Sequence, residues 1–156
     1  MKNCELTKND RKGSTAKKLF TGTLTVKGSI ISIVVFFAVV AVMLLSHSSV
    51  ELGDESFKAS AVFVAPVEIA YDSVDSVTLL DRDKLDLGEK TSGFSNLFTI
   101  AGSYINDEYG LYDVYLDKSN DANCILVNYQ KVGYVVFSTG DPEETNSIYE
   151  ELLLRV

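Results

Sequence analysis

The chain has 156 residues, which is room for one modest domain with a tail and a membrane span but not for two domains. Hydrophobic residues make up 46% of it, and its formal net charge is −8. The charge is unevenly divided: residues 1–28 hold seven Lys/Arg against two acids, a net +5, whereas residues 47–156 hold seven against twenty, a net −13. So acidic a segment is repelled by nucleic acid and by anionic lipid headgroups, which argues against a nucleic-acid-binding protein.

The basic residues 1–28 lack apolar periodicity, and we expect a disordered tail that either binds nothing or is weakly attracted to anionic lipid. In the apolar run that follows, from Ile30 to Leu45, only Ser32 is polar. With its neutral flanks the run covers roughly 28 Å as a helix, close to the thickness of a bilayer core. We therefore predict one transmembrane helix over residues 29–46. Because basic residues beside a span stay in the cytoplasm, the tail is expected to be cytoplasmic and the C-terminal part extracytoplasmic, in a single-pass protein of the cell membrane.

A cleaved signal peptide is the alternative to this anchor. Ser46 and Ser48 are small residues at the spacing that suits cleavage after Ser48. The long basic segment and the length of the apolar run, which exceeds a signal core of about 7–15 residues, favour the anchor. With an anchor, Cys4 and Cys124 lie on opposite sides of the membrane and cannot pair. Cys124 has apolar neighbours and is expected to be buried as a small hydrophobic side chain.

Residues 47–56 are expected to form a polar linker, and residues 57–156 a domain in which strand signals dominate. Alternating and β-branched runs, bounded by Gly, Pro and charged loops, predict about seven short strands. Pro66 is expected to end the first strand because it has no N–H to donate to a ladder. Gln130 and Lys131 are expected to form the turn of the last hairpin. The strands are expected at residues 60–64, 67–71, 77–80, 97–101, 109–116, 124–129 and 132–138.

An amphipathic helix is expected to end the domain. Asp141 suits the N-cap, Pro142 the first helical position, and Glu144 a capping-box pairing. An apolar stripe at helical spacing should cover the open end of the sheet; it comprises Ile148, Tyr149, Leu152, Leu153 and Val156. The expected fold class is mainly β (α+β).

The order of these elements, with several short motifs, resembles the bacterial pleckstrin-homology-like (PH-like) domains over roughly residues 57–153. The motifs are IAYDSVDSVTLL (69–80), LGEKTSGF (87–94), GSY (102–104), EYGLY (108–112), YVVFS (134–138) and DPEET (141–145). The resemblance implies a strongly bent antiparallel sheet or barrel closed by the C-terminal helix. It does not carry over a phosphoinositide site, because the first two strands hold Pro66, Glu68 and Asp72 where such a site needs basic residues.

Site chemistry is sparse in the sequence. The one histidine, His47, is expected to lie at the membrane face outside the domain, so no Ser-His-Asp set can form within it. There is no glycine-rich phosphate loop and no Cys/His cluster. The acidic stretch from Asp81 to Glu89 resembles a calcium loop, but Asp86 and Ser92 stand where the glycine and the closing glutamate belong. We therefore predict a protein that is not an enzyme and has no cofactor or metal ion.

Two functions remain. One is a membrane-anchored, non-enzymatic interaction module that binds an unknown protein partner through rim loops or a strand edge. The alternative is a surface-held or secreted binder of a small ligand or cation, through the sheet mouth and the acidic loop. The candidate interaction surface comprises Tyr104, Tyr109, Tyr115, Asp81, Asp83 and Asp86. Other aromatic residues are expected in the core: Tyr71, Phe94, Tyr112, Tyr134 and Phe137. The expected partners are the bilayer, through residues 29–46, and a protein, with no phosphoinositide and no nucleic acid.

Overall fold

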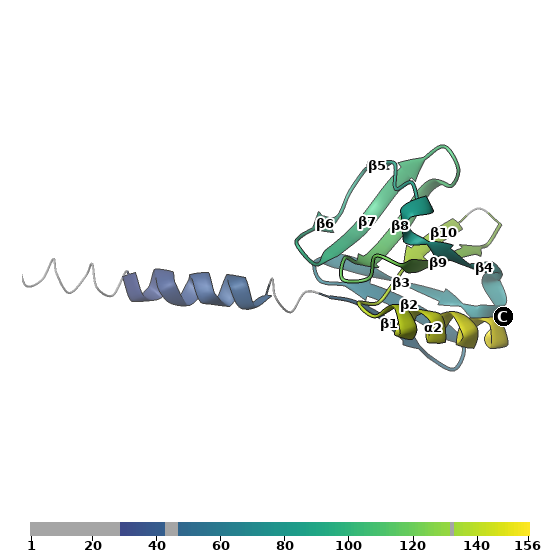
Figure 1. Ribbon diagram of the computed structural model, residues 1–156, viewed down its shortest axis with the longest axis horizontal. Coiled ribbons are helices and arrows are strands. Elements are labelled where there is room, and N and C mark those ends of the chain that lie inside the picture. The colour runs from purple at the N-terminus through teal and green to yellow at the C-terminus, as the bar shows by residue number, and fades with distance from the viewer. Residues whose placement is uncertain (1–28, 43–46, 132) are drawn as a thin grey trace, which may run out of the picture. The chain divides into compact units, whose positions relative to one another are not determined.

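The structure is a computed structural model that describes residues 29–42, 47–131 and 133–156. The chain divides into two compact units, residues 1–42 and 43–156. In the first unit a helix covers residues 29–42. The second unit is a mainly β domain with a C-terminal helix (Figure 1). The expected tail and residues 43–46 of the expected span lie outside the described residues.

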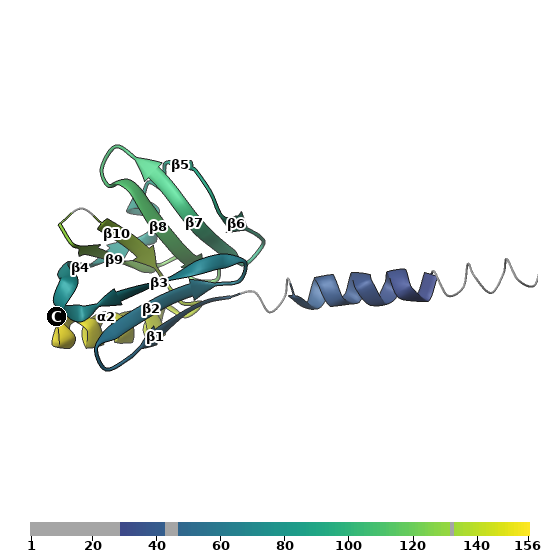
Figure 2. The ribbon, with the colours of Figure 1, turned by 180° about the vertical axis from the view of Figure 1, so that it is seen from behind.

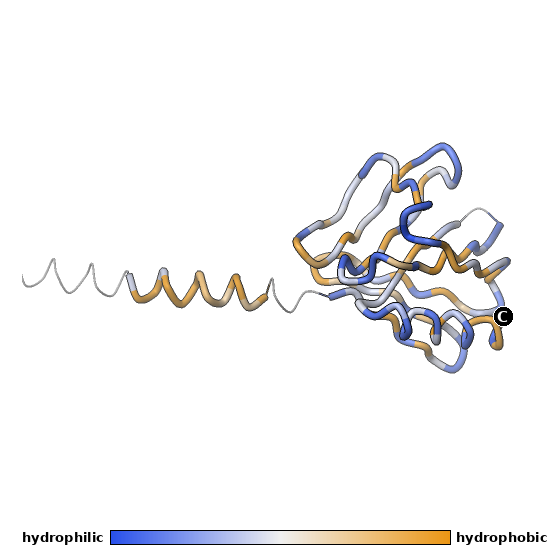
Figure 3. The backbone as a smooth tube through the Cα atoms, viewed as in Figure 1, coloured by the Kyte–Doolittle hydropathy of each residue, from blue (hydrophilic) through white to orange (hydrophobic). Residues whose placement is uncertain are grey.

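The helix over residues 29–42 is apolar apart from Ser29 and Ser32. Nine of its large side chains are exposed, from 44% for Val42 to 65% for Phe37. Figure 3 shows hydrophobic residues along its length. In the part of the chain that the structure describes, no helix has both the length and the apolar character that crossing a membrane requires.

Two sheets build the β domain. The smaller has the strand order β1-β2-β3, and the larger has the order β4-β9-β10-β8-β7-β5, with β6 also paired to β7 (Figures 1 and 2). The smaller sheet consists of β1 (Ser48–Leu52), β2 (Ser56–Ala61) and β3 (Val64–Ala70). The larger consists of β4 (Val74–Asp81), β5 (Glu89–Lys90), β6 (Phe94–Ser95), β7 (Thr99–Asn106), β8 (Gly110–Asp117), β9 (Asn123–Tyr129) and β10 (Gly133–Phe137). Short 3-10 helices, η1 (Tyr71–Ser73) and η2 (Arg82–Lys84), follow β3 and β4.

The expected mainly β class with a C-terminal helix is confirmed, but the expected bent antiparallel sheet or barrel is not found among the described residues. The described residues form two separate sheets, and β10 lies between β8 and β9, parallel to β8. Val135, Val136 and Phe137 of β10 are fully buried in succession, so apolar layers cover both faces of this strand. The expected hairpin is confirmed, because β9 and β10 pair antiparallel.

The domain also begins earlier than expected. β1 lies within the segment expected to be a linker, and its alternate residues Val50 and Leu52 pack against the core. Pro66 lies inside β3 instead of ending a strand. Because β3 is an edge strand, the missing N–H of Pro66 does not interrupt the sheet.

The main core lies between the two sheets and is shared by α2 (Pro142–Arg155). Phe57 of β2 and Phe137 of β10 meet there with ring centroids 5.5 Å apart. α2 packs beside β4 and β9 and contributes the fully buried Leu152. Two members of the expected stripe are exposed, Leu153 by 44% and Val156 by 49%. The N-cap is confirmed: the Asp141 side chain accepts a hydrogen bond from Glu143 N at 2.9 Å.

A second apolar cluster lies on the other face of the larger sheet. The segment after β4 covers part of it, with Leu85 and Leu87 packed against the cluster. The Tyr112 hydroxyl fixes this cover by donating to Leu87 O at 2.9 Å. Cys124 is fully buried there, as expected, and burial raises the pKa of its thiol to about 11. The larger sheet is therefore apolar on both faces.

Candidate functional site

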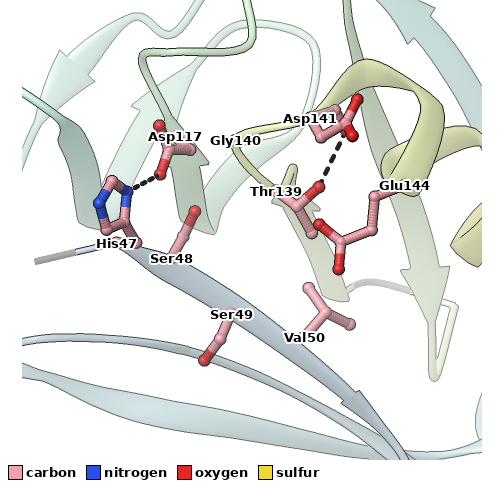
Figure 4. Close-up of a pocket in the computed structure, with 9 residues that line it drawn as sticks. All are labelled: His47, Ser48, Ser49, Val50, Asp117, Thr139, Gly140, Asp141 and Glu144. Atoms are coloured by element: carbon pink, nitrogen blue, oxygen red, sulfur yellow. Dashed lines mark hydrogen bonds and ion pairs between the residues drawn. The ribbon is translucent and has the colours of Figure 1, made fainter. Parts of the chain in front are cut away.

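An open cleft of about 370 Å³ lies where β1 begins, beside the ends of β8 and β10 and the start of α2 (Figure 4). Segments far apart in the sequence meet there because β1 runs next to the last turn before α2. The lining residues are His47, Ser48, Ser49, Val50, Asp117, Thr139, Gly140, Asp141 and Glu144.

At the centre of this cleft is a buried carboxylate. Asp117 ends β8, is 0% exposed, and accepts a hydrogen bond from Ser119 N at 2.9 Å. Its other oxygen lies 2.8 Å from Nδ1 of His47, whose side chain is 53% exposed. An ionised carboxylate only accepts hydrogen bonds, so Nδ1 donates. The expectation that His47 lies outside the domain is therefore wrong: the histidine is bound to the end of β8.

A buried polar network lies behind the cleft. The Asn120 amide donates to Thr145 Oγ1 at 3.0 Å and to Asn123 Oδ1 at 2.9 Å. Thr145 Oγ1 also accepts from Thr139 N at 3.2 Å. These contacts join the β8–β9 turn to the first turn of α2. Sequence reasoning missed all of these residues, because short polar side chains in loops resemble ordinary turn residues. The one available signal was the Ser138-Thr139 pair shortly before the N-cap.

The hydroxyls of the cleft make hydrogen bonds that do not involve the His47 imidazole. Ser48 Oγ donates to Ser138 O at 2.8 Å, and Thr139 Oγ1 donates to Asp141 O at 3.0 Å. Ser49 Oγ pairs with Ser60 Oγ at 2.9 Å. A carboxylate-oriented imidazole can accept or deliver a proton, but acyl transfer also needs a nucleophile within hydrogen-bond reach of it. The hydrogen bonds of His47 and Ser48 instead hold the start of β1 against the larger sheet. Within residues 29–42, 47–131 and 133–156, no three His, Cys, Asp or Glu side chains are grouped to hold a metal ion.

Two of the three tyrosines proposed for the interaction surface are buried. Tyr104 is 6% exposed and Tyr115 is 3% exposed, so their expected exposure is wrong. Both faces of the larger sheet are apolar, and alternation therefore does not bring either residue to solvent. Tyr115 bridges the sheets by donating its hydroxyl to Ala65 O at 2.6 Å. Tyr109 is half-buried, with its ring against Tyr112 and Tyr134.

The three acidic members of that surface are exposed. Asp81 forms an ion pair with Lys84, and Asp86 Oδ1 accepts from Gly88 N at 2.9 Å. Both carboxylates are thus engaged by their own loop, which also covers the second apolar cluster. Of the aromatic residues expected in the core, three are buried and two are half-buried: Tyr71, Tyr112 and Phe137 in the first group, Phe94 and Tyr134 in the second.

The unshared strand edges are a further surface that sequence reasoning did not locate. β4 is eight residues long, pairs with β9 on one side, and has no second partner strand among the described residues. β3 is an edge strand of the smaller sheet, but it contains Pro66 and Glu68. Proline and charge are the usual protections of an edge against strand addition, and β4 has neither between Val77 and Leu80.

Comparison with protein-family models, with curated proteins and with solved structures gives no significant match. The resemblance to PH-like domains therefore stays a prediction.

Proposed function

We propose that this chain is a membrane-anchored, non-enzymatic interaction module whose PH-like domain lies on the extracytoplasmic face. The observation that carries the proposal is the helix over residues 29–42, whose apolar side chains are exposed at nine positions. Such a helix is stable in hydrocarbon and costly in water. The basic tail before it, with a net +5, supports the orientation with the N-terminus in the cytoplasm.

The partner is a protein, and the edge of β4 is the surface that binds it. An extended segment added there would continue the larger sheet through backbone hydrogen bonds, at the usual strand spacing of about 4.8 Å. Thr78 and Leu79 are exposed on this strand, so the incoming segment also meets side chains on both faces. The engaged hydroxyls around His47 and Asp117 support a binding role over catalysis.

Limited proteolysis tests the anchoring. Protease added to intact cells, with any outer layer opened, is expected to remove residues 49–156 and to spare residues 2–27. Protection of the C-terminal part contradicts the orientation. A mature N-terminus at Ser49 would show that the span is a cleaved signal peptide.

Photo-crosslinking in intact membranes tests the binding edge. A photoreactive residue at Thr78, on the β4 edge, should capture a protein partner, whereas one at Glu150, exposed on α2, should not. Adding a charge with Leu79→Lys should abolish capture from position 78, because an exposed lysine disfavours strand addition. Equal capture from positions 78 and 150 would contradict the β4 interface.

A further inference from the structure

Several apolar side chains lie together at one end of the β domain. Phe63, in the β2–β3 turn, is 71% exposed, and Leu97, between β6 and β7, is 81% exposed. The ring of Phe63 packs edge-on against Phe94 with centroids 5.2 Å apart, and residues 94–98 frame an apolar hollow of about 240 Å³. We name the set Phe63, Phe94, Leu97 and Phe98 the apolar rim. Figure 3 shows the loop after β6 as hydrophobic.

The strand register brings this rim to the place where the β domain begins. Ser48 pairs with Ala61, so the β2–β3 turn lies beside the first residues of β1. The ring of Phe98 lies 6.0 Å from that of His47. Figure 2 shows the β2–β3 turn and β6 at the end of the domain where β1 starts. The rim therefore lies at the same end of the domain as His47, the first described residue after the apolar segment.

The backbone at Phe63 is a second, independent observation. Its φ is 65°, in the left-handed region that a bulky side chain rarely adopts. Glycine or asparagine would fit this turn without strain, and burial does not compensate a side chain that is 71% exposed. An exposed aromatic ring held in a strained turn is unfavourable for the domain in water, which indicates that the ring has a contact outside the chain.

We propose that the apolar rim lies in the interfacial layer of the bilayer that holds residues 29–46, so that the domain rests on the membrane surface. This inference depends on the anchoring in the proposed function. Five peptide units join Val42 to His47 and span at most about 18 Å, which keeps the rim within reach of the interface. Phenylalanine and leucine partition into that layer, and the tether supplies a high effective concentration.

A lipid surface fits the rim better than a protein does, because the short connection leaves little space between domain and bilayer. The lipid must be zwitterionic, since residues 47–156 carry a net −13 and are repelled by anionic headgroups. Lys118 contacts the rim loop, where its Nζ donates to Asn96 O at 2.6 Å.

The chain contains no tryptophan, so a single introduced indole reports its own surroundings. The full chain would be reconstituted in phosphatidylcholine vesicles as the variants Phe63→Trp, Leu97→Trp and Leu111→Trp. Leu111 is the matched control: it is 63% exposed and lies six residues along β8 from Asp117, about 20 Å from the rim end. At positions 63 and 97 we expect blue-shifted emission, loss of emission with brominated phosphatidylcholine, and protection from iodide. At position 111 we expect quenching by iodide only.

Each other outcome overturns the inference. Iodide quenching at positions 63 and 97 equal to that at 111 shows that the rim is in water. Protection from both quenchers shows that the rim contacts protein. Extraction of the chain by alkaline carbonate would contradict both the anchoring and the inference. A chain that stays in the membrane, but whose indoles at positions 63 and 97 are not quenched by brominated lipid, contradicts the inference alone. Because these positions are exposed, the variants should melt at the parent temperature by circular dichroism.

Discussion

At the scale of single residues, the pair of His47 and Asp117 is the most consequential contact outside the apolar cores. It joins two residues 70 positions apart and supplies one of the hydrogen bonds of a carboxylate that is 0% exposed. A buried carboxylate is costly unless it is hydrogen-bonded. The contact therefore fixes where β1 starts against the larger sheet.

Replacing this histidine should destabilise the domain. We expect His47→Ala to lower the free energy of unfolding of residues 47–156 by about 1–3 kcal/mol, because Asp117 loses a charge-assisted hydrogen bond. Ser49→Ala is the control: it removes the exposed hydrogen bond between the Ser49 and Ser60 hydroxyls and should change the free energy of unfolding by no more than about 0.5 kcal/mol. Urea denaturation measures both. Equal effects of the two variants would show that the pair contributes nothing specific.

Three buried or half-buried tyrosines predict how stability depends on alkaline pH. Burial raises the pKa of Tyr109, Tyr112 and Tyr115 to about 12 in each case. A tyrosine in the unfolded chain titrates near pH 10, so the folded state keeps its protons to higher pH than the unfolded state. The stabilisation is complete below about pH 10 and is lost as the pH rises towards 12. Urea midpoints should fall across this window, and titration of Tyr109, Tyr112 and Tyr115 near pH 10 in the folded domain would contradict this.

At the scale of elements, α2 completes the main core through few residues. Thr145 and Leu152 are its buried side chains, while Leu154 is 88% exposed. The helix thus stabilises the fold through Leu152 and its half-buried neighbours Ile148 and Tyr149. Truncation before Asp141 should accordingly expose the core face at β4 and β9 and cause aggregation.

Substitutions at two leucines of α2, one buried and one exposed, distinguish core packing from the stability of the helix itself. Leu152→Asp should cost at least about 2–5 kcal/mol, the range for truncating a buried leucine, with an unpaired buried charge added to it. Leu154→Asp is the control two residues away and should be nearly neutral. Thermal melts of residues 47–156 followed by circular dichroism compare them. A Leu152→Asp domain that melts cooperatively near the parent temperature would disprove the packing role of α2.

Sequence patterns succeeded where the determinant is local. The β9–β10 hairpin, the Asp141 N-cap and the burial of Cys124 each follow from a few adjacent residues. Patterns failed where the determinant is distant. The burial of Tyr115 depends on the smaller sheet, and the role of Asp117 depends on His47, which no local signal connects. The parallel pairing of β8 and β10 likewise joins strands that are not consecutive in the sequence.

At the scale of the whole molecule, the separation of charge is the dominant property. A net +5 precedes the apolar segment and a net −13 follows it. The seven Lys/Arg of the acidic part form no basic cluster in the sequence, and two of them, Lys84 and Arg155, are ion-paired with acids. Long-range attraction to an anionic surface is therefore excluded by sign, although contact with a neutral surface is not.

This charge predicts the behaviour of the isolated domain with lipid. Residues 47–156 should not bind vesicles of phosphoinositide or phosphatidylserine at physiological salt, where the Debye length is about 8 Å. Vesicle co-sedimentation at micromolar protein measures this. Saturable, salt-sensitive binding that is lost when Arg82→Glu and Lys84→Glu are combined would contradict the prediction and reveal a phosphate-binding site on the loop after β4.

The central position of β10 has a consequence for the order in which the domain can fold. Without residues 133–137 the larger sheet falls into two separate pieces, β4 with β9 and β8 with β7 and its short partners, because β10 supplies the contacts between them. β10 follows every other described strand in chain order, so synthesis reaches it after its neighbours. The domain therefore cannot close while most of it is being synthesised, and its many non-local pairings slow closure further. Under the proposed orientation, this late closure keeps the domain unfolded while it crosses the membrane, and the sheet becomes rigid only on the far side.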